Sequence, residues 1–235
     1  MTTGQLHQTH SISRTHLLGQ VAVRLLAGIP VLMLLLFLPA GTWNYWQAWV
    51  YLAVLFTPML FALVYMLKVA PDLLERRMRA REKESVQKGI ITVSLVYFLV
   101  VFMLPGLDQR FGWSDVPTAV IIAADLIVLL GYGIVLLVFR ENRYASRVVE
   151  VEQEQSVISS GPYSIVRHPM YVGMLLMYIS SPLALGSWWA LLPALLMIPI
   201  LMARIRNEEI VLVRDLPGYT AYMEQVKYRL LPGVW

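Results

Sequence analysis

Long apolar blocks alternate with short polar segments along this chain. A helix needs roughly 20 mostly apolar residues to cross about 30 Å of hydrocarbon. Four blocks meet or nearly meet this requirement: Val21–Ala40, Ala48–Leu67, Ile90–Leu107 and Pro117–Phe139. A fifth block, Met170–Ala203, would reach roughly 50 Å as one helix at about 1.5 Å per residue, which exceeds the thickness of the bilayer.

The fifth block carries a turn signal at its centre. Residues 185–189 read Leu-Gly-Ser-Trp-Trp, in which a glycine and a serine precede two aromatic residues typical of a membrane interface. The pattern predicts a helical hairpin with the arms Met170–Leu185 and Ala190–Ala203. Three prolines should kink these arms: Pro182, Pro193 and Pro199. We therefore expect an all-α polytopic membrane protein with about six spans.

The composition supports this fold class. Hydrophobic residues make up 58% of the 235 residues and charged residues only 14%, whereas soluble domains are about 25% charged. This composition excludes an ordinary water-soluble enzyme and a disordered protein. The absence of cysteine excludes a disulfide scaffold, thiol nucleophiles and zinc–thiolate sites.

Basic residues are distributed unevenly between the two sides of the predicted membrane. With six spans both termini lie on one side, and all 19 lysines and arginines except Arg110 fall there. The positive-inside rule predicts that this side is the cytoplasm, at an inner or plasma membrane. Topology signals and contacts with anionic lipid headgroups account for the formal charge of +4, so we expect membrane lipids as partners and no nucleic acid.

The predicted spans divide the chain into three regions. Residues 1–20 are expected to form a disordered cytoplasmic N-terminus, and residues 21–139 a four-span membrane region. Residues 140–235 form a C-terminal region with the hairpin at 170–203 and a cytoplasmic tail. The histidines of the N-terminal segment are spaced too irregularly to predict a metal site: His7, His10 and His16.

Two polar features interrupt the membrane region. The segment Pro71–Lys88 predicts an interfacial amphipathic helix, with Leu73, Leu74 and Met78 beneath a charged face. Asp125 lies near the middle of the fourth span, where a carboxylate is a candidate proton or ion relay. Because no second acidic residue lies deep in a span, we favour a structural role for Asp125, neutral or hydrogen-bonded.

Polar residues also concentrate at the two ends of the predicted hairpin. Arg167 and His168 precede the first arm, and Pro169 favours a helix start there. Arg204 and Glu208 follow the second arm, so the fold brings both pairs to the same edge of the membrane. Two interpretations are equally supported by this spacing. One is a partly dehydrated functional site, and the other is topology signals followed by a solvated helix.

Three motifs follow one another within residues 157–235. Residues 161–173 contain Gly-Pro-Tyr and then Val-Arg-His-Pro-Met-Tyr-Val-Gly, residues 204–212 contain Arg-x₃-Glu-Glu-x₂-Leu, and residues 218–222 contain Gly-Tyr-x₂-Tyr. Together they resemble the isoprenylcysteine carboxyl methyltransferase family. The Arg-His-Pro-x-Tyr-x-Gly element alone is shared with phospholipid N-methyltransferases and sterol reductases, and the Arg-x₃-Glu-Glu element makes the resemblance more specific.

The resemblance implies an integral-membrane enzyme that binds S-adenosylmethionine as its cofactor at a cytoplasmic site. It implies that Arg204 is the catalytic residue and holds the carboxylate of a lipophilic small-molecule or lipidated acceptor, for which a planar guanidinium is suited. A carboxylate is ionised near pH 7 and needs no general base. The implied cofactor-binding residues are Gln155, Ser156, Val157, Ile158, Tyr163, His168, Pro169, Met170, Tyr171 and Glu208.

Two alternative functions stay open. An enzyme of the same fold can methylate an amine, as in phospholipid N-methylation, with His168, Glu208 and Glu209 as the available bases. A non-catalytic transporter or membrane scaffold would instead explain Asp125 and the intramembrane prolines.

Overall fold

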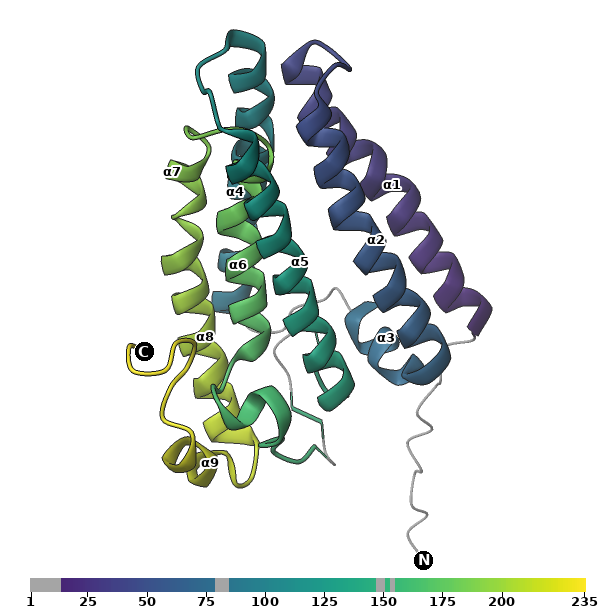
Figure 1. Cartoon of the computed structure of the whole chain (residues 1–235). Coiled ribbons are helices and arrows are strands. Elements are labelled where there is room, and N and C mark those ends of the chain that lie inside the picture. Colours follow the sequence, from purple (N-terminus) through teal and green to yellow (C-terminus); the bar gives the residue numbers. More distant parts are fainter. Residues whose placement is uncertain (1–13, 79–84, 147–150, 153–154) are drawn as a thin grey trace, which may run out of the picture.

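The computed structural model describes residues 14–78, 85–146, 151–152 and 155–235 (Figure 1). Within these ranges the chain forms helices and connecting turns and no strand, which confirms the predicted all-α class. A 3-10 helix, η1 (Gly161–Ser164), lies between α5 and α6. The α-helices are α1 (Arg14–Ala40), α2 (Trp46–Val69), α3 (Pro71–Met78), α4 (Ser85–Phe111), α5 (Thr118–Glu141), α6 (Pro169–Ala184), α7 (Leu191–Ala194), α8 (Met197–Asp215) and α9 (Tyr219–Gln225).

Four helices, α1, α2, α4 and α5, are long and apolar enough to cross a membrane. They coincide with the four predicted spans, which confirms the hydropathy pattern. Helix α1 begins at Arg14, so residues 14–20, which we expected to be disordered, are helical. The rest of the predicted disordered segment, residues 1–13, lies outside the described residues.

The predicted hairpin in the fifth apolar block is confirmed. Helix α6 ends at Ala184, the chain turns, and α7 and α8 return beside α6 (Figure 1). The returning arm is interrupted between α7 and α8, because Pro199 has no N–H to donate to the carbonyl of Leu195. Helix α8 continues beyond the apolar block to Asp215 and so carries its polar half out of the bundle.

Helices α5 and α6 pack closely at two glycines. A Cβ built on Gly131 would lie 2.6 Å from the carbonyl oxygen of Gly173, and a Cβ built on Gly173 would lie 2.6 Å from that of Gly131. Only glycine allows two backbones to approach this closely. This crossing holds the first turns of α6, which include Tyr171, against α5.

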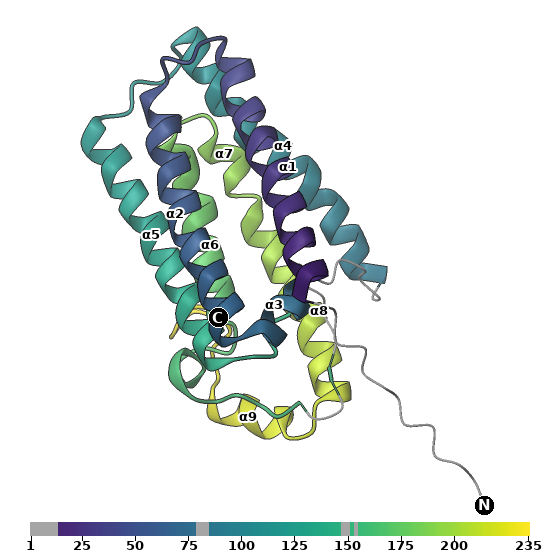
Figure 2. The ribbon, with the colours of Figure 1, turned by 90° about the vertical axis from the view of Figure 1, so that its right-hand side faces the viewer.

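Helix α3 lies at the same end of the bundle as α9 (Figures 1 and 2). Leu73 and Leu74 are buried in a cluster with residues of α1, α2 and α5, as expected for an amphipathic helix. The structure describes α3 over Pro71–Met78, and residues 79–84 of the predicted segment Pro71–Lys88 lie outside the described residues. Residues 85–88 of that segment belong to the first turn of α4 instead.

Asp125 is buried within α5, with 5% of its surface exposed. Neither of its carboxylate oxygens has a hydrogen-bond partner among the described residues. The residue also lies outside the walls of the pocket and the cavities described below. We expected Asp125 to have a structural role as a neutral or a hydrogen-bonded carboxyl group. The described residues offer it no hydrogen bond, so the hydrogen-bonded role is not supported.

Candidate active site

A polar pocket lies at the end of the bundle that carries α3 and α9. It is enclosed by the loop after α5, by η1 and the start of α6, by the polar half of α8 and by α9. Eight of the ten residues predicted to bind a cofactor line this polar pocket: Ser156, Val157, Ile158, Tyr163, His168, Met170, Tyr171 and Glu208. The hairpin and the tail thus bring these residues together from distant parts of the sequence.

The other two predicted residues, Gln155 and Pro169, do not line the polar pocket. The side chain of Gln155 turns back onto its own loop, where Oε1 accepts a hydrogen bond of 3.2 Å from the backbone N–H of Glu152. Pro169 is buried at the first position of α6, with His168 as the N-cap residue. Its contribution is the helix start that orients His168 and Tyr171 toward the pocket.

Nine lining residues were not among the predicted cofactor-binding or catalytic residues, although Arg167 was one of the polar residues predicted at this edge of the membrane. The Gly-Tyr-x₂-Tyr motif was the signal for two of them, Tyr219 and Tyr222, although it gave them no role. The hydroxyl of Tyr222 donates to the carbonyl oxygen of Tyr163 at 2.7 Å, whereas the buried hydroxyl of Tyr219 has no partner among the described residues. The nine are Asn142, Tyr144, Ala145, Ser146, Arg167, Leu212, Leu216, Tyr219 and Tyr222.

The hydroxyl of Tyr171 connects the two predicted motifs. Nε of Arg204 donates a hydrogen bond of 2.9 Å to this oxygen, and the hydroxyl itself donates to Oε2 of Glu208 at 2.5 Å. The first turn of α6 therefore meets α8 at the edge of the polar pocket, as the hairpin predicted. The short bond to the carboxylate is typical of a charge-assisted hydrogen bond and fixes the orientation of Glu208.

Glu209 lies beside Glu208 in sequence but in a different environment. Its Oε1 accepts hydrogen bonds from Nε of Arg167 at 2.8 Å and from Nε2 of His168 at 3.2 Å, and its Oε2 accepts one from Nε of Arg229 at 2.7 Å. Burial raises the pKa of Glu209, but the hydrogen bonds from His168, Arg167 and Arg229 outweigh it and lower the pKa to about 2. A carboxylate with this pKa is a poor general base, so Glu209 acts as a fixed anion.

The last residues of the chain support the same cluster. The backbone N–H groups of Arg167 and His168 donate to the carbonyl oxygens of Tyr228 and Arg229 at 2.9 and 3.0 Å. The guanidinium of Arg229 lies 5.1 Å from the centre of the Trp235 ring. The tail therefore fixes the backbone of Arg167 and His168 directly before α6.

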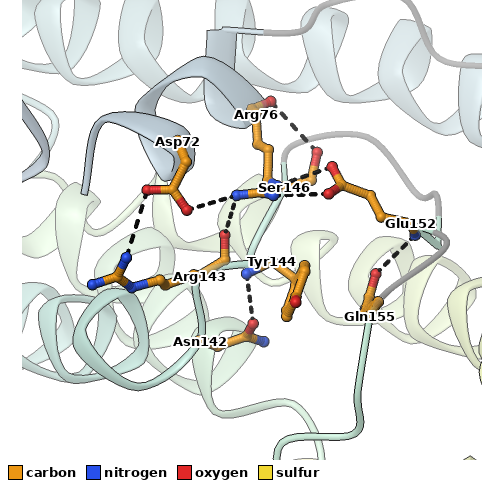
Figure 3. A network of polar contacts seen from close by, with 8 residues as sticks. All are labelled: Asp72, Arg76, Asn142, Arg143, Tyr144, Ser146, Glu152 and Gln155. Atoms are coloured by element: carbon orange, nitrogen blue, oxygen red, sulfur yellow. Dashed lines mark hydrogen bonds and ion pairs between the residues drawn. The ribbon is translucent and has the colours of Figure 1, made fainter. Parts of the chain in front are cut away.

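An ion-pair network holds the loop after α5 against α3 (Figure 3). Arg76 donates from Nε and Nη2 to the two carboxylate oxygens of Glu152 at 2.9 and 2.8 Å, and from Nη1 to Asp72 at 2.9 Å. Its guanidinium also lies 5.2 Å from the centre of the Tyr144 ring. Because Tyr144 and Ser146 line the polar pocket, α3 supports one of its walls.

Two mostly apolar cavities meet the polar pocket at Met170, which lines all three. Arg204 lines only the lateral cavity, and Tyr171 lines both that cavity and the polar pocket. The lateral cavity, between α4, α6 and α8, is lined by Arg77, Ile90, Ile91, Ser94, Leu95, Phe98, Ser146, Met170, Tyr171, Met174, Tyr178, Met197, Ile200, Leu201 and Arg204. The inner cavity, between α1, α2, α3, α5 and α6, is lined by Val21, Arg24, Leu25, Met59, Ala62, Leu63, Met66, Leu74, Arg77, Met78, Tyr132, Val135, Leu136, Phe139, Met170, Met174, Met177 and Tyr178.

Comparison with known proteins assigns a class to this arrangement. Residues 119–216 match the family model described as phospholipid methyltransferase. The matched range runs from α5 to the end of α8 and includes His168, Tyr171, Arg204 and Glu208, whereas α1 to α4 lie outside it. The match supports a membrane methyltransferase, a class that contains the predicted family without selecting it. The comparison with curated proteins gives no match.

Proposed function

We propose that the protein is an S-adenosylmethionine-dependent methyltransferase that O-methylates the carboxylate of a lipophilic acceptor of the isoprenylcysteine type. The observation that carries this proposal is the position of Met170, where the polar pocket meets two apolar cavities. A water-soluble methyl donor and an acceptor dissolved in the membrane need such a junction to react. The family match supports the methyltransferase class.

The residues of the polar pocket fit this cofactor. Glu208 offers a carboxylate to a cationic or hydroxyl-bearing ligand, and Tyr144 and Tyr163 offer aromatic rings that attract cations and stack on a purine. The buried hydroxyl of Tyr219 has no partner among the described residues and suits a polar ligand atom. When bound, S-adenosylmethionine supplies an electrophilic methyl carbon, to which the acceptor oxygen bonds while the carbon–sulfur bond breaks and leaves its electron pair on sulfur.

The side chains of the protein position the cofactor and the acceptor. Methyl transfer to an ionised carboxylate requires no proton transfer, so the rate depends on holding two reacting atoms in line. Arg204 faces the lateral cavity and shares the Tyr171 hydroxyl with Glu208. We assign Arg204 to the acceptor carboxylate and Glu208 to the cofactor, so that Tyr171 couples the two binding sites.

We propose that the end of the bundle with the polar pocket faces the cytoplasm. Helix α1 begins and the chain ends at this end (Figure 1). In the sequence, all lysines and arginines except Arg110 belong to the segments predicted to lie on the same side of the membrane as the termini. The chain lacks cysteine, so single cysteines can test the orientation. Glu224→Cys should react with a membrane-impermeant maleimide only from the cytoplasmic side, and Trp113→Cys only from the opposite side.

Calorimetry on the purified protein tests the enzyme proposal. S-adenosylmethionine should bind the wild type, and His168→Ala and Glu208→Ala should each weaken binding about tenfold or more, because each removes a polar partner from the pocket. Glu224→Ala, at an exposed position of α9, is the matched control and should bind like the wild type. Failure of the folded wild type to bind the cofactor would overturn the proposal.

The description of the matched family favours a second acceptor class, the amine of a phospholipid. The two acceptors give chemically different products. Membranes that contain the protein are incubated with cofactor carrying a labelled methyl group, and the labelled lipids are treated with mild alkali. Release of the label identifies a methyl ester, whereas label that resists alkali identifies a methylated amine.

A further inference from the structure

The lateral cavity runs from the outer surface of the bundle to the candidate reaction centre. On α4, Ile91 and Leu95 are 43% and 62% exposed, and both line the cavity. At the other end, Leu201 is buried and lies in the same walls as Tyr171 and Arg204. The wall on α4 therefore faces the lipid phase, and an apolar chain can enter between α4 and α8 without passing through water.

Two arginines from distant parts of the sequence line this apolar cavity. Arg204 comes from α8, inside the family-matched range, and Arg77 comes from α3, outside it. Nη1 of Arg77 donates to the carbonyl oxygen of Ala145 at 3.1 Å, and its guanidinium lies 4.6 Å from the centre of the Phe139 ring. These contacts, with the buried side chains of Leu73 and Leu74, hold the guanidinium in a defined place.

We propose that Arg77 and Arg204 together bind the anionic headgroup of the methyl acceptor, whose apolar chain occupies the lateral cavity. The proposal rests on the proposed function for the identity of the ligand as an acceptor. It adds Arg77 as a residue that determines acceptor specificity. It also assigns the apolar chain of the acceptor to the lateral cavity and not to the inner cavity.

Charge complementarity supports an anionic ligand. The described residues that line the lateral cavity include two arginines and no aspartate or glutamate. A guanidinium pairs with a carboxylate or a phosphate through two parallel hydrogen bonds, and the low dielectric constant of an apolar cavity strengthens this pairing. A cationic amphiphile would meet two like charges in the same surroundings and should be rejected.

Four probes that share one apolar hydrocarbon chain and differ in their headgroup test which headgroup class binds: oleate, oleyl phosphate, oleyl alcohol and oleylamine. Radiolabelled oleate is bound to the purified full-length protein in amphipol, with protein-free amphipol as background. Oleate and oleyl phosphate should compete for the bound label, and the better competitor of the two identifies the headgroup as carboxylate or phosphate. Oleyl alcohol and oleylamine should compete at least tenfold less well. Equal competition by all four probes would overturn the proposal.

Substitutions at the arginines test the headgroup site. Arg77→Gln should weaken oleate binding about tenfold, which is the loss expected for one charged hydrogen-bonding partner. Arg77→Lys keeps the charge and should recover part of the affinity. Arg140→Gln removes an exposed charge from the end of α5 and should bind oleate like the wild type. Wild-type affinity in Arg77→Gln, or an equal loss in Arg140→Gln, would overturn the proposal.

Substitutions in the walls test the choice of cavity. Leu95→Trp narrows the lateral cavity and should weaken oleate binding, whereas Leu99→Trp, one turn along α4 at a 41% exposed position outside the walls, should not. Ala62→Leu narrows the inner cavity and should leave binding unchanged. The reverse result, in which only Ala62→Leu weakens oleate binding, would overturn the assignment of the acceptor's apolar chain to the lateral cavity.

Cofactor calorimetry on the same variants keeps this proposal separate from the proposed function. Leu95→Trp should bind S-adenosylmethionine like the wild type, because Leu95 does not line the polar pocket. Arg77→Gln should lose much less affinity for the cofactor than for oleate, because Arg77 reaches that pocket only through its hydrogen bond to Ala145. If the wild type binds no cofactor, the proposed function fails whatever the oleate result. If cofactor binds and the oleate series shows no anion preference, the headgroup site alone is wrong.

Discussion

Gly131 and Gly173 face each other where α5 crosses α6, so closely that a Cβ on either would lie 2.6 Å from the carbonyl oxygen of the other. We predict that Gly131→Ala forces these helices apart and destabilises the protein by about 2 kcal/mol, the usual cost of overpacking. For a chain of this length that is a fall in Tm of about 4–8 °C. Thermal unfolding of the purified protein in detergent measures the change.

Gly133 provides the matched control on the same helix. A Cβ built there meets no atom within 4 Å. Gly133→Ala should therefore keep or raise Tm, since alanine favours a helix over glycine. Equal destabilisation by both variants would show that helix flexibility, rather than the contact with Gly173, explains the effect.

Glu209 gives the structure a defined response to pH. Its pKa is lowered from 4.5 to about 2, so the ionised form stabilises the fold fully above about pH 4.5, and this contribution is lost as the pH falls toward 2. We predict that Glu209→Gln lowers Tm at pH 7 by about 6–12 °C, which corresponds to about 3 kcal/mol for the loss of one member of a buried ion pair. The difference between wild type and variant should shrink as the pH falls through this range.

The control for this pH dependence is Glu224→Gln. Glu224 is exposed on α9, so its substitution should change Tm little at any pH. A Glu209→Gln difference that stayed constant between pH 6 and pH 2.5 would contradict the assignment of the effect to ionisation of Glu209.

The sequence predicted the helices better than the details of the site, for a physical reason. Apolar stretches and the glycine-serine turn act locally, so the four spans and the hairpin follow from composition. Adjacent residues on a helix, by contrast, point about 100° apart. Glu208 therefore faces the polar pocket while Glu209 faces Arg167 and Arg229, although their chemistry is the same.

Residues missed by the sequence interpretation depend on contacts between distant segments. Arg76 appears in the sequence as one of several charges on an amphipathic helix. Only the docking of α3 against the loop after α5 brings it to Glu152 and lets it support the wall at Tyr144. The same docking places Arg77 in the lateral cavity. No periodicity or local motif encodes these contacts.

The bidentate pair of Arg76 with Glu152 should affect the polar pocket through the loop it holds. We predict that Arg76→Gln and Glu152→Gln each weaken S-adenosylmethionine binding about fivefold, since the loop residues Tyr144 and Ser146 lose their fixed positions. Calorimetry on the single and double variants measures the coupling. The double variant should bind no more weakly than either single variant.

Arg143→Gln is the control for removal of a charge from the same loop. The Arg143 side chain is 61% exposed and its nearest approach to Asp72 is 4.0 Å, so the pair contributes little. This variant should bind the cofactor like the wild type. Additive losses in the Arg76→Gln, Glu152→Gln double variant would show that the two side chains act separately.

Substitutions of Asp125 distinguish the enzyme proposal from the transporter alternative. Because it lies outside the polar pocket and both cavities, Asp125→Asn should leave cofactor binding and methyl transfer within about twofold of the wild type. Replacement by leucine should raise Tm, because a buried carboxylate without a hydrogen-bond partner among the described residues is unfavourable. Substrate flux in proteoliposomes that depends on Asp125 and not on the cofactor would instead favour a transporter.

The hydroxyl of Tyr171 should be required for efficient transfer, because Arg204 donates to it and it donates to Glu208. We predict that Tyr171→Phe lowers kcat/KM by about 10- to 100-fold, the loss expected for hydrogen bonds to charged groups. The rate is measured as transfer of the labelled methyl group from the cofactor into membrane lipids. Tyr228→Phe removes a hydroxyl from a partly exposed ring and should retain wild-type rates. If Tyr171→Phe weakens cofactor binding but leaves the rate at saturating cofactor unchanged, Tyr171 orients Glu208 alone; if kcat falls as well, it also positions the acceptor through Arg204.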